Sequence, residues 1–292
     1  MSNVGIALLA IVSWVAVNLL VRGSLDVWPV NLAGVLGRMV TVSILGVWIG
    51  ATGSGWRRLR PGACTGWLLL MGIVAIALNL LWYNAMYWTT ATNAALLFRL
   101  DLVFVVLLGT CLGLERIRAS QLGLLGVMLL GLALFLEVQR FDLSGHLVGD
   151  AMVLGAACGY AVNAFIIRHI LATMDEMAVS LYNLTFSGLG FAAVAWVRGD
   201  YGQLARVGAQ PGAWWWIAGL GVMTAISLPL YYAALRRMPI WKLRTWMLLA
   251  PLLVAAVEGP VWGISISPVR AVGGAVMLLG LAGLIRLERA QP

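Results

Sequence analysis

The sequence predicts an all-α integral membrane protein whose ten transmembrane helices form a 5+5 inverted repeat. Three observations support this prediction: the composition, the spacing of the apolar runs and an internal repeat. Of the 292 residues, 62% are hydrophobic and 10% are charged, and the mean hydropathy is +0.96. A water-soluble domain of this size could not bury so much apolar surface, so the hydrophobic residues must face lipid.

Ten apolar runs have roughly the 20 residues that a helix needs to cross the hydrocarbon core of a bilayer. The first five are Val4–Val21, Val30–Ala51, Cys64–Trp88, Thr92–Gly113 and Ser120–Leu136. The second five are Gly149–Leu171, Met177–Val197, Ala213–Leu235, Ile240–Trp262 and Pro268–Leu287. We therefore predict a first five-helix repeat at residues 1–137 and a second at residues 147–292. No arginine or lysine precedes the first run, so we expect a retained helix rather than a cleaved signal peptide.

The two halves share sequence. Val127–Ala133 recurs letter for letter as Val276–Ala282, an offset of 276 − 127 = 149 residues. At the same offset Trp67 matches Trp216. Because five is odd, the second repeat must enter the bilayer from the side opposite to the first. Inverted repeats of this kind are typical of secondary transporters.

The net charge of +8 comes mostly from arginines in the short connections between apolar runs. Such arginines are enriched on the cytoplasmic side of membranes. Their distribution predicts cytoplasmic termini and a multi-pass protein of the cell (inner) membrane. Since topology accounts for this charge, we expect no nucleic-acid partner. The arginines assigned to the cytoplasmic side are Arg57, Arg58, Arg60, Arg116, Arg118, Arg236, Arg237, Arg286 and Arg289.

Motifs of catalysis and of nucleotide binding are absent: the chain has no Walker A, HExxH or CxxC pattern. The three cysteines, Cys64, Cys111 and Cys158, stand alone within apolar stretches and are interpreted as packing residues. We therefore predict that the protein is not an enzyme and has no metal site or cofactor. Transport would draw on an ion gradient or on the gradient of the solute itself.

Charged residues within the predicted spans are the main functional candidates, because a charge at the bilayer centre costs about 2.5–3.5 kcal/mol or more. They are Arg38 in span two, Arg99 and Asp101 in span four, and Glu258 in span nine. Lys242 and Arg244 start span nine and are expected to extend to the membrane surface.

Arg99 and Asp101 are two residues apart, so they point to different faces of a helix and each needs another partner. Asp101 with Arg38, or Arg99 with Glu258, are the pairings we consider. Two interpretations stay open: an ion pair that locks helices together, or charges that line a polar cavity.

Polar and aromatic residues add a second set of candidates. Asn79 and Tyr83 share one face of span three. Tyr231 and Tyr232 lie in the matching span eight, and Asn163 in span six matches Asn18 in span one. Hydrogen bonds between helices would explain any one of them, whereas a symmetric set favours a central cavity. Trp246 is expected to pack against the apolar part of a solute.

Several motifs resemble the drug/metabolite transporter superfamily in its ten-helix EamA form. They include Tyr83-Asn84-Ala85-Met86, Asn93-Ala94-Ala95, Leu114-Glu115-Arg116, Gly149-Asp150 and Leu249-Ala250-Pro251. The resemblance implies a 5+5 inverted repeat, cytoplasmic termini, a central cavity and export of small metabolites. The chain departs from the family in span four, where Leu102 replaces a proline that the second repeat keeps as Pro251.

These observations lead to the hypothesis of a secondary transporter of small metabolites, an exporter of amino acids or related carboxylates that works by alternating access. Arg38 or Arg99 would hold the carboxylate, and Asp101 or Glu258 would hold the amine or a coupling proton. The expected partners are a small-molecule solute, the lipid bilayer and protons, with the chain as a monomer or homodimer. The alternatives are a membrane-embedded enzyme or flippase acting on lipid-linked substrates, and a non-transporting membrane subunit.

Overall fold

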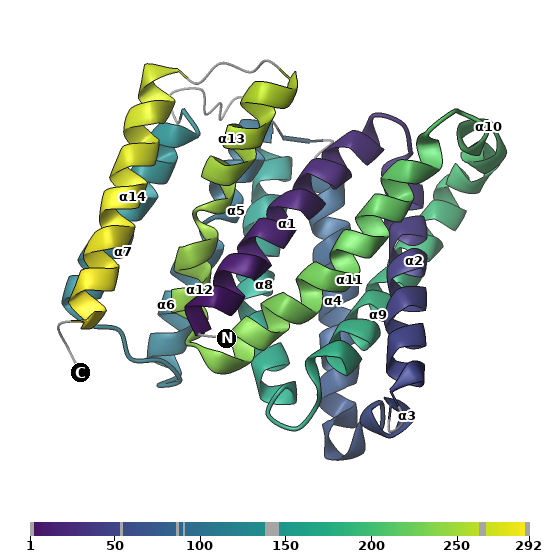
Figure 1. The fold of residues 1–292 in the computed structure, drawn as a ribbon, viewed down its shortest axis with the longest axis horizontal. Coiled ribbons are helices and arrows are strands. Elements are labelled where there is room, and N and C mark those ends of the chain that lie inside the picture. Colours follow the sequence, from purple (N-terminus) through teal and green to yellow (C-terminus); the bar gives the residue numbers. More distant parts are fainter. Residues whose placement is uncertain are drawn as a thin grey trace. The chain divides into compact units, whose positions relative to one another are not determined.

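A computed structural model describes residues 3–52, 55–85, 88–89, 91–137, 146–262 and 267–289. Every regular element in these residues is a helix (Figure 1). Among them, nine spans are long and apolar enough to cross a membrane, and a tenth apolar helix, Ala119–Phe135, is shorter. These ten segments coincide with the ten apolar runs, which confirms the predicted all-α transmembrane fold.

The helices follow the order expected from the sequence. The first repeat contains α1 (Asn3–Leu25), α2 (Val30–Ala51), α4 (Thr65–Ala85), α5 (Ala91–Phe98), α6 (Asp101–Cys111) and α7 (Ala119–Phe135). The second contains α8 (Leu147–Ile170), α9 (Glu176–Arg198), α11 (Ala213–Arg237), α12 (Ile240–Met247), α13 (Ala250–Trp262) and α14 (Pro268–Arg289). Short connecting helices are α3 (Gly55–Arg58), η1 (Gly62–Cys64), η3 (Asp200–Gln203) and α10 (Leu204–Gly208).

Spans four and nine are each broken into two helices, although each is a single apolar run in the sequence. The first break follows α5, which ends at Phe98, and the second follows α12, which ends at Met247. The interval of 247 − 98 = 149 residues equals the offset of the sequence repeat. The break is therefore a feature of the repeat itself.

The same change in backbone hydrogen bonding produces both breaks. The N–H groups of Arg99 and Leu248 each bond to the carbonyl three residues earlier, at 3.1 Å, instead of the carbonyl four residues earlier. Pro251 favours the second break because proline has no N–H to continue an α-helix. Span four has Leu102 at the matching position. The break in span four therefore does not depend on proline, which is why the sequence pattern did not predict it.

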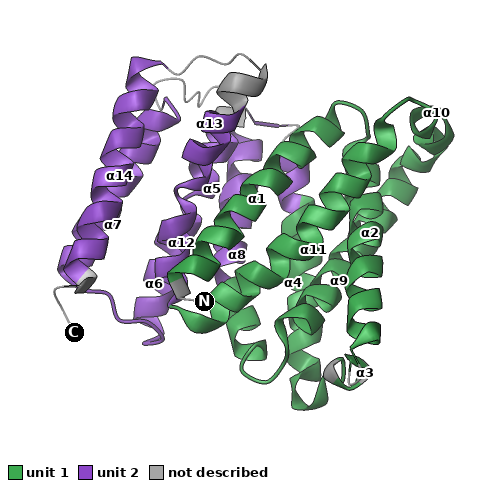
Figure 2. Cartoon of the chain, viewed as in Figure 1, with its two compact units in different colours: residues 1–80, 163–238 green, residues 81–162, 239–292 purple. Residues whose placement is uncertain are grey.

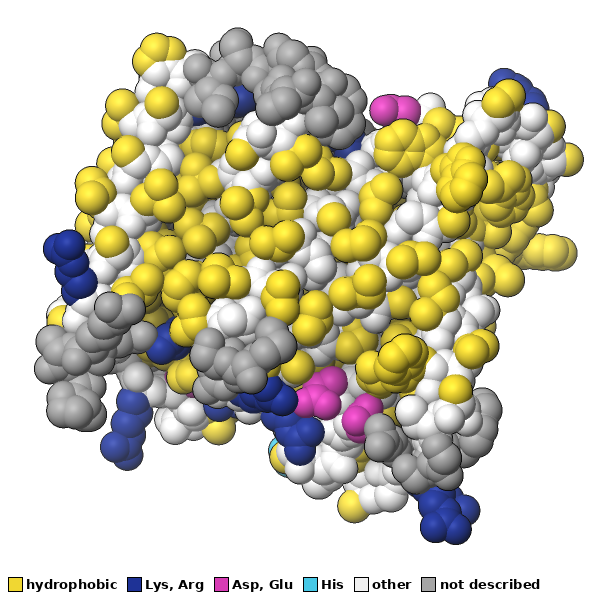
Figure 3. Space-filling view, viewed as in Figure 1, with side chains coloured by type: hydrophobic (Ala, Val, Ile, Leu, Met, Phe, Trp, Pro, Cys, Tyr) yellow, Lys and Arg dark blue, Asp and Glu magenta, His cyan; other side chains and the backbone are white. Residues whose placement is uncertain are grey.

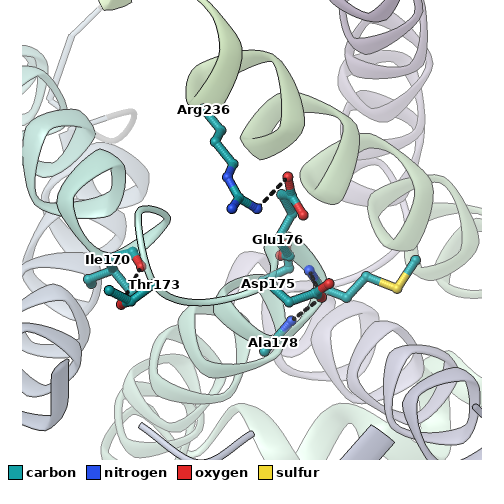
Figure 4. Close-up of polar contacts among 8 residues, drawn as sticks. Ile170, Thr173, Asp175, Glu176, Ala178 and Arg236 are labelled. Carbon is teal, nitrogen blue, oxygen red and sulfur yellow. Dashed lines mark hydrogen bonds and ion pairs between the residues drawn. The ribbon is translucent and has the colours of Figure 1, made fainter. Parts of the chain in front are cut away.

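Residues at both ends explain the bounds of α9. Asp175 accepts hydrogen bonds from the N–H groups of Met177 and Ala178, which have no partner within the helix (Figure 4). The next residue, Glu176, pairs with Arg236 at 3.4 Å. Gly199 ends the helix with φ +72°, a conformation that costs glycine little.

The chain forms two compact units (Figure 2). Unit 1 comprises residues 1–80 and 163–238, and holds α1, α2, α9, α11 and most of α4. Unit 2 comprises residues 81–162 and 239–292, and holds α5, α6, α7, α12, α13, α14 and most of α8. Each sequence half contributes helices to both units.

Small residues allow close helix packing in unit 1, where α2 contacts α9 and α11, and α11 contacts α1. A Cβ atom on Gly34 would lie 2.8 Å from the ring of Phe191, and one on Gly221 would lie 2.4 Å from Val40. Thr41 donates a hydrogen bond to the Gly221 carbonyl at 3.0 Å. Such contacts between small residues bring membrane helices together without a hydrophobic effect.

The repeated heptapeptide contacts its own copy in unit 2. Its two copies lie in α7 and α14, which pack against each other. A Cβ on Gly131 would lie 2.8 Å from the backbone nitrogen of Met277, and one on Gly280 would lie 2.6 Å from the Met128 side chain. Gly131 and Gly280 are equivalent in the repeat, as are Met128 and Met277. The repeated letters thus encode a pseudo-symmetric helix contact.

Gly131→Ala is expected to destabilise the protein by about 1–3 kcal/mol, because the added methyl group meets backbone atoms of α14 that cannot move aside easily. Gly126→Ala on the same helix is the matched control. Nothing lies within 4 Å of a Cβ at Gly126, so better helix propensity should leave stability unchanged or raise it. Thermal unfolding of the purified variants measures both effects. Equal melting temperatures would contradict this account of the α7–α14 contact.

The molecular surface agrees with a lipid environment. Hydrophobic side chains predominate on the face shown in Figure 3, and Lys and Arg side chains gather near helix ends. Large apolar residues are exposed in mid-helix, including Val47 at 73% and Leu130 at 67%. Exposed apolar surface of this extent is expected only where lipid is the solvent.

Candidate functional site

A buried ion pair lies beside the helix break in unit 2. Asp101 Oδ2 is 3.1 Å from Arg244 Nη1, and the two side chains are only 3% and 10% exposed. The position of Arg244 near the start of its span predicts a side chain that extends to the membrane surface, and this prediction is wrong. Its guanidinium turns inward because α12 packs against α6, which begins with Asp101. Asp101 therefore pairs with Arg244 rather than with Arg38.

Backbone hydrogen bonds continue across the break in span four. Asp101 is the first residue of α6, and Arg99 follows the last residue of α5. The N–H groups of Leu102 and Phe104 bond to the carbonyls of Arg99 and Leu100, at 3.3 and 3.0 Å. The break is therefore a local change in the hydrogen-bond pattern, with one charge on each side of Leu100.

Arg99 makes few polar contacts with the described residues. Its guanidinium carbon lies 6.0 Å from the centre of the Phe98 ring, and its charge interacts through space with Asp101 and Arg244. Among the residues that the structure describes, no acceptor forms a hydrogen bond or an ion pair with it.

Aromatic residues of unit 2 lie next to this arginine. The ring centres of Trp82 and Phe98 are 4.3 Å apart, and those of Phe98 and Tyr160 are 5.4 Å apart. Two sequence candidates belong to the same unit. Tyr83 is half-buried in the last turn of α4, and Trp246 is buried in α12 at 6% exposure. No direct contact joins either of them to Arg99 among the described residues.

Arg38, in unit 1, has several neutral partners. It donates hydrogen bonds to Ser187 Oγ at 2.8 Å, to Asn79 Oδ1 at 2.8 Å and to the Gly34 carbonyl at 3.2 Å. Its guanidinium also stacks on Phe191, 4.3 Å from the ring centre. The structure thus brings together two sequence candidates, Arg38 and Asn79. Together they link α2, α4 and α9.

The remaining unit 1 candidates lie on α8 and α11. The rings of Tyr231 and Tyr232 are 5.7 Å apart, and Tyr231 is 5.9 Å from Trp14 of α1. Asn163 is 4% exposed, and its amide oxygen has no hydrogen-bond partner among the described residues. A buried amide oxygen without a partner costs free energy. The side chain of Glu258 lies outside the described residues.

Three buried carboxylates in unit 2 were not among the sequence candidates, and each lies near the start of a helix. Glu115 accepts hydrogen bonds from the first two N–H groups of α12, and Glu137 contacts the start of α14. Asp150 accepts hydrogen bonds from Thr89 and Asn93, two residues that flank the start of α5. Glu115 and Asp150 lie within the family motifs, and that resemblance was the only sequence signal for them.

Comparisons with known proteins agree with this fold. The model of the EamA-like transporter family matches residues 1–137 and 147–286. A protein described as an uncharacterized transporter, from Archaeoglobus fulgidus, is 26% identical over 194 residues, and the match covers 66% of each chain. A crystal structure superposes with a TM-score of 0.78, covers 98% of both chains and is 20% identical, a likeness that shows the fold alone.

The family match covers both repeats and confirms the resemblance seen in the sequence motifs. It also agrees with the many apolar spans of the structure, which make this a multi-pass membrane protein. The chain belongs to the EamA-like transporter family and is a membrane transporter of small solutes.

Proposed function

We propose that the protein is a secondary exporter of small metabolites that carry a carboxylate, such as amino acids or related acids, and that Arg99 binds this carboxylate. The observation that carries the proposal is the state of Arg99. It lies within a membrane span, at a helix break, and no described residue engages its guanidinium through a hydrogen bond or ion pair. Broken helices are where secondary transporters place solute sites.

The chemistry of this cluster favours an anionic group over a neutral one. Arg99, Asp101 and Arg244 bring two positive charges and one negative charge together. A carboxylate would add a negative charge beside the two arginines, and guanidinium groups bind carboxylates with two parallel hydrogen bonds. A purely apolar solute would leave the charge unbalanced in a medium of low dielectric constant.

Asp101 is the group in this cluster suited to a solute amine. Its present partner is Arg244, so a zwitterion could exchange partners with the pair: its carboxylate would bind the arginines and its ammonium group Asp101. If the solute has no amine, Asp101 or Glu258 would serve as the site of a coupling proton. These roles, like the alternating-access cycle, belong to the proposal.

The other sequence candidates divide into two groups. We assign Arg38 and Asn79 to structural support, because their hydrogen bonds with each other and with neighbouring helices already use the groups that would bind a solute. Asn163 is retained as a polar solute contact because its amide oxygen is buried and unpaired among the described residues. Tyr83, Tyr231, Tyr232 and Trp246 are retained as apolar and aromatic contacts.

The proposed direction of transport and the proposed orientation in the membrane rest on the sequence. The arginine distribution favours cytoplasmic termini in the cell membrane, and the family resemblance favours export. Uptake into inside-out vesicles and into right-side-out cells would distinguish export from import.

A matched panel of solutes tests the substrate class. Each of the twenty amino acids and its 2-oxo acid is added to the purified protein alongside the corresponding amide, and the melting temperature is recorded. We expect some acids to raise the melting temperature and their amides to have no effect. Acids that bind should then be transported in proteoliposomes. Binding of amides as tight as that of acids would contradict the proposed role of Arg99.

The same assay separates the rival classes. A membrane-embedded enzyme or flippase for lipid-linked substrates, or a non-transporting subunit, would not accumulate soluble carboxylates in proteoliposomes.

A further inference from the structure

We infer that Glu115 is a positioning residue for transport. It fixes the start of α12, while Arg244, further along α12, is held by its ion pair with Asp101. The solute releases this ion pair, and α12 then moves as a lever about its fixed start. The inference rests on the proposed function, which supplies the solute carboxylate. It assigns a role to a residue outside the solute-binding cluster.

The fixed end of the lever is the first turn of α12. Glu115 is 6% exposed and accepts hydrogen bonds from the N–H groups of Ile240, at 2.5 Å, and Trp241, at 3.1 Å, one on each carboxylate oxygen. The first N–H groups of a helix have no partner within it, and Pro239 precedes them. The negative charge also matches the positive end of the helix dipole. One carboxylate therefore satisfies the start of α12.

The releasable end is one helical turn further along. Arg244 follows Ile240 by four residues and pairs with Asp101 at 3.1 Å. Asp101 begins α6, and Glu115 follows the end of α6 through a turn in which its own N–H bonds to the Gly109 carbonyl at 3.0 Å. A single segment, residues 101–115, thus holds α12 at two points.

The contacts of α12 with Glu115 and with Asp101 differ in whether a solute carboxylate could replace the protein carboxylate. At Glu115 the donors are backbone N–H groups, which cannot leave the carboxylate unless the whole helix start moves. At Asp101 the partner is an arginine side chain, and a solute carboxylate can take the place of Asp101 on it. The solute can therefore compete for the Asp101–Arg244 ion pair but not for the hydrogen bonds to Glu115. When the ion pair is released, α12 rotates about its start, which Glu115 still holds.

Glu137 provides a matched control within the same unit. It is 4% exposed, accepts a hydrogen bond from Ser267 at 2.8 Å and pairs with Arg270 at 3.5 Å, at the start of α14. It too is a buried carboxylate at a helix start. However, α14 carries no member of the Arg99, Asp101 and Arg244 cluster. Loss of Glu137 should affect stability alone.

The first test compares Glu115→Gln with Glu137→Gln. A glutamine oxygen can accept one of the two N–H groups, and its NH2 group faces the other. The probe is the panel acid that wild-type protein binds best. We expect lower melting temperatures in both variants, and an increase of about tenfold in KM only for Glu115→Gln, the effect of one lost charge-assisted hydrogen bond. Equal KM values in the two folded variants would overturn the inference.

The second test does not require the Glu115 variant to fold. Hydrogen–deuterium exchange of the full-length wild-type protein is measured with and without the same acid. We expect peptides that contain the Ile240 and Trp241 amides to stay protected, whereas exchange changes in peptides from Arg244 onward. Asp101→Asn, without any solute, should give the same pattern. Loss of protection at Ile240 and Trp241 when the acid binds would show that this end is not fixed. In Asp101→Asn, which is destabilised overall, the contradicting result is exchange at these two amides as fast as in peptides from Arg244 onward.

These outcomes separate the two proposals. If no panel acid binds, the proposed substrate class fails, and the exchange pattern of Asp101→Asn still decides the role of Glu115. If an acid binds with its affinity unaltered by Glu115→Gln, only the lever fails.

Discussion

Replacing Arg99 with glutamine is expected to weaken carboxylate binding at least about 30-fold while leaving the protein folded. The expected loss corresponds to the roughly 2 kcal/mol or more that a desolvated, charge-assisted contact contributes. Folding should be preserved because no hydrogen bond or ion pair to a described residue depends on the Arg99 guanidinium. The binding constant of the best panel acid, measured by calorimetry, gives the first quantity, and the melting temperature gives the second.

Arg38→Gln is the informative control for that result, since both residues are arginines within membrane spans. Arg38 has three hydrogen bonds and a stacked ring, so its loss should reduce the melting temperature substantially. The protein that remains folded should bind the acid as wild type does. A variant of Arg99 that unfolds, or one that binds normally, would remove Arg99 from the proposed site. Arg99→Lys should bind with intermediate affinity, because lysine keeps the charge but cannot form two parallel hydrogen bonds.

The transmembrane framework could be predicted from the sequence because it depends on composition and length. All ten apolar runs became helices, and the repeated heptapeptide found its counterpart across the α7–α14 contact. Each of these features follows from a local pattern: lipid requires long apolar helices, and small residues mark where helices approach closely. The family resemblance rested on motifs of the same local kind.

The details of the charged cluster could not be predicted in the same way. The break in span four has no proline to signal it, and the apolar residues around Arg99 and Asp101 give no sign of a shift in backbone hydrogen bonding. Arg244 looked like a surface residue because it lies four residues from the start of its run. Its inward turn depends on where α6 lies, which is tertiary information. For the same reason Arg38 was grouped with Arg99, although only the structure distinguishes their partners.

Asp101→Asn is expected to destabilise the protein by about 3–5 kcal/mol, the largest stability effect in this site. The substitution removes the negative charge from a pair whose side chains are 3% and 10% exposed, and it leaves the positive charge of Arg244 in a medium that solvates it poorly. Equilibrium unfolding in detergent micelles would measure the loss. A change below about 1 kcal/mol would mean that the pair is hydrated like one at a protein surface.

Removing the partner as well should restore most of this stability. In the double variant Asp101→Asn with Arg244→Gln, no isolated charge of the pair remains, and two amides of similar size can bond to each other. The coupling between the two positions, obtained from the two single variants and the double variant, should therefore be large. Transport and binding assays of the double variant distinguish a structural role of the pair from a role in solute binding. The double variant should fold yet bind the panel acid poorly, because one arginine and the only described carboxylate of the cluster are gone. If it instead transported at the wild-type rate, Asp101 and Arg244 would be a structural pair, and Arg99 alone would have to account for recognition of the solute.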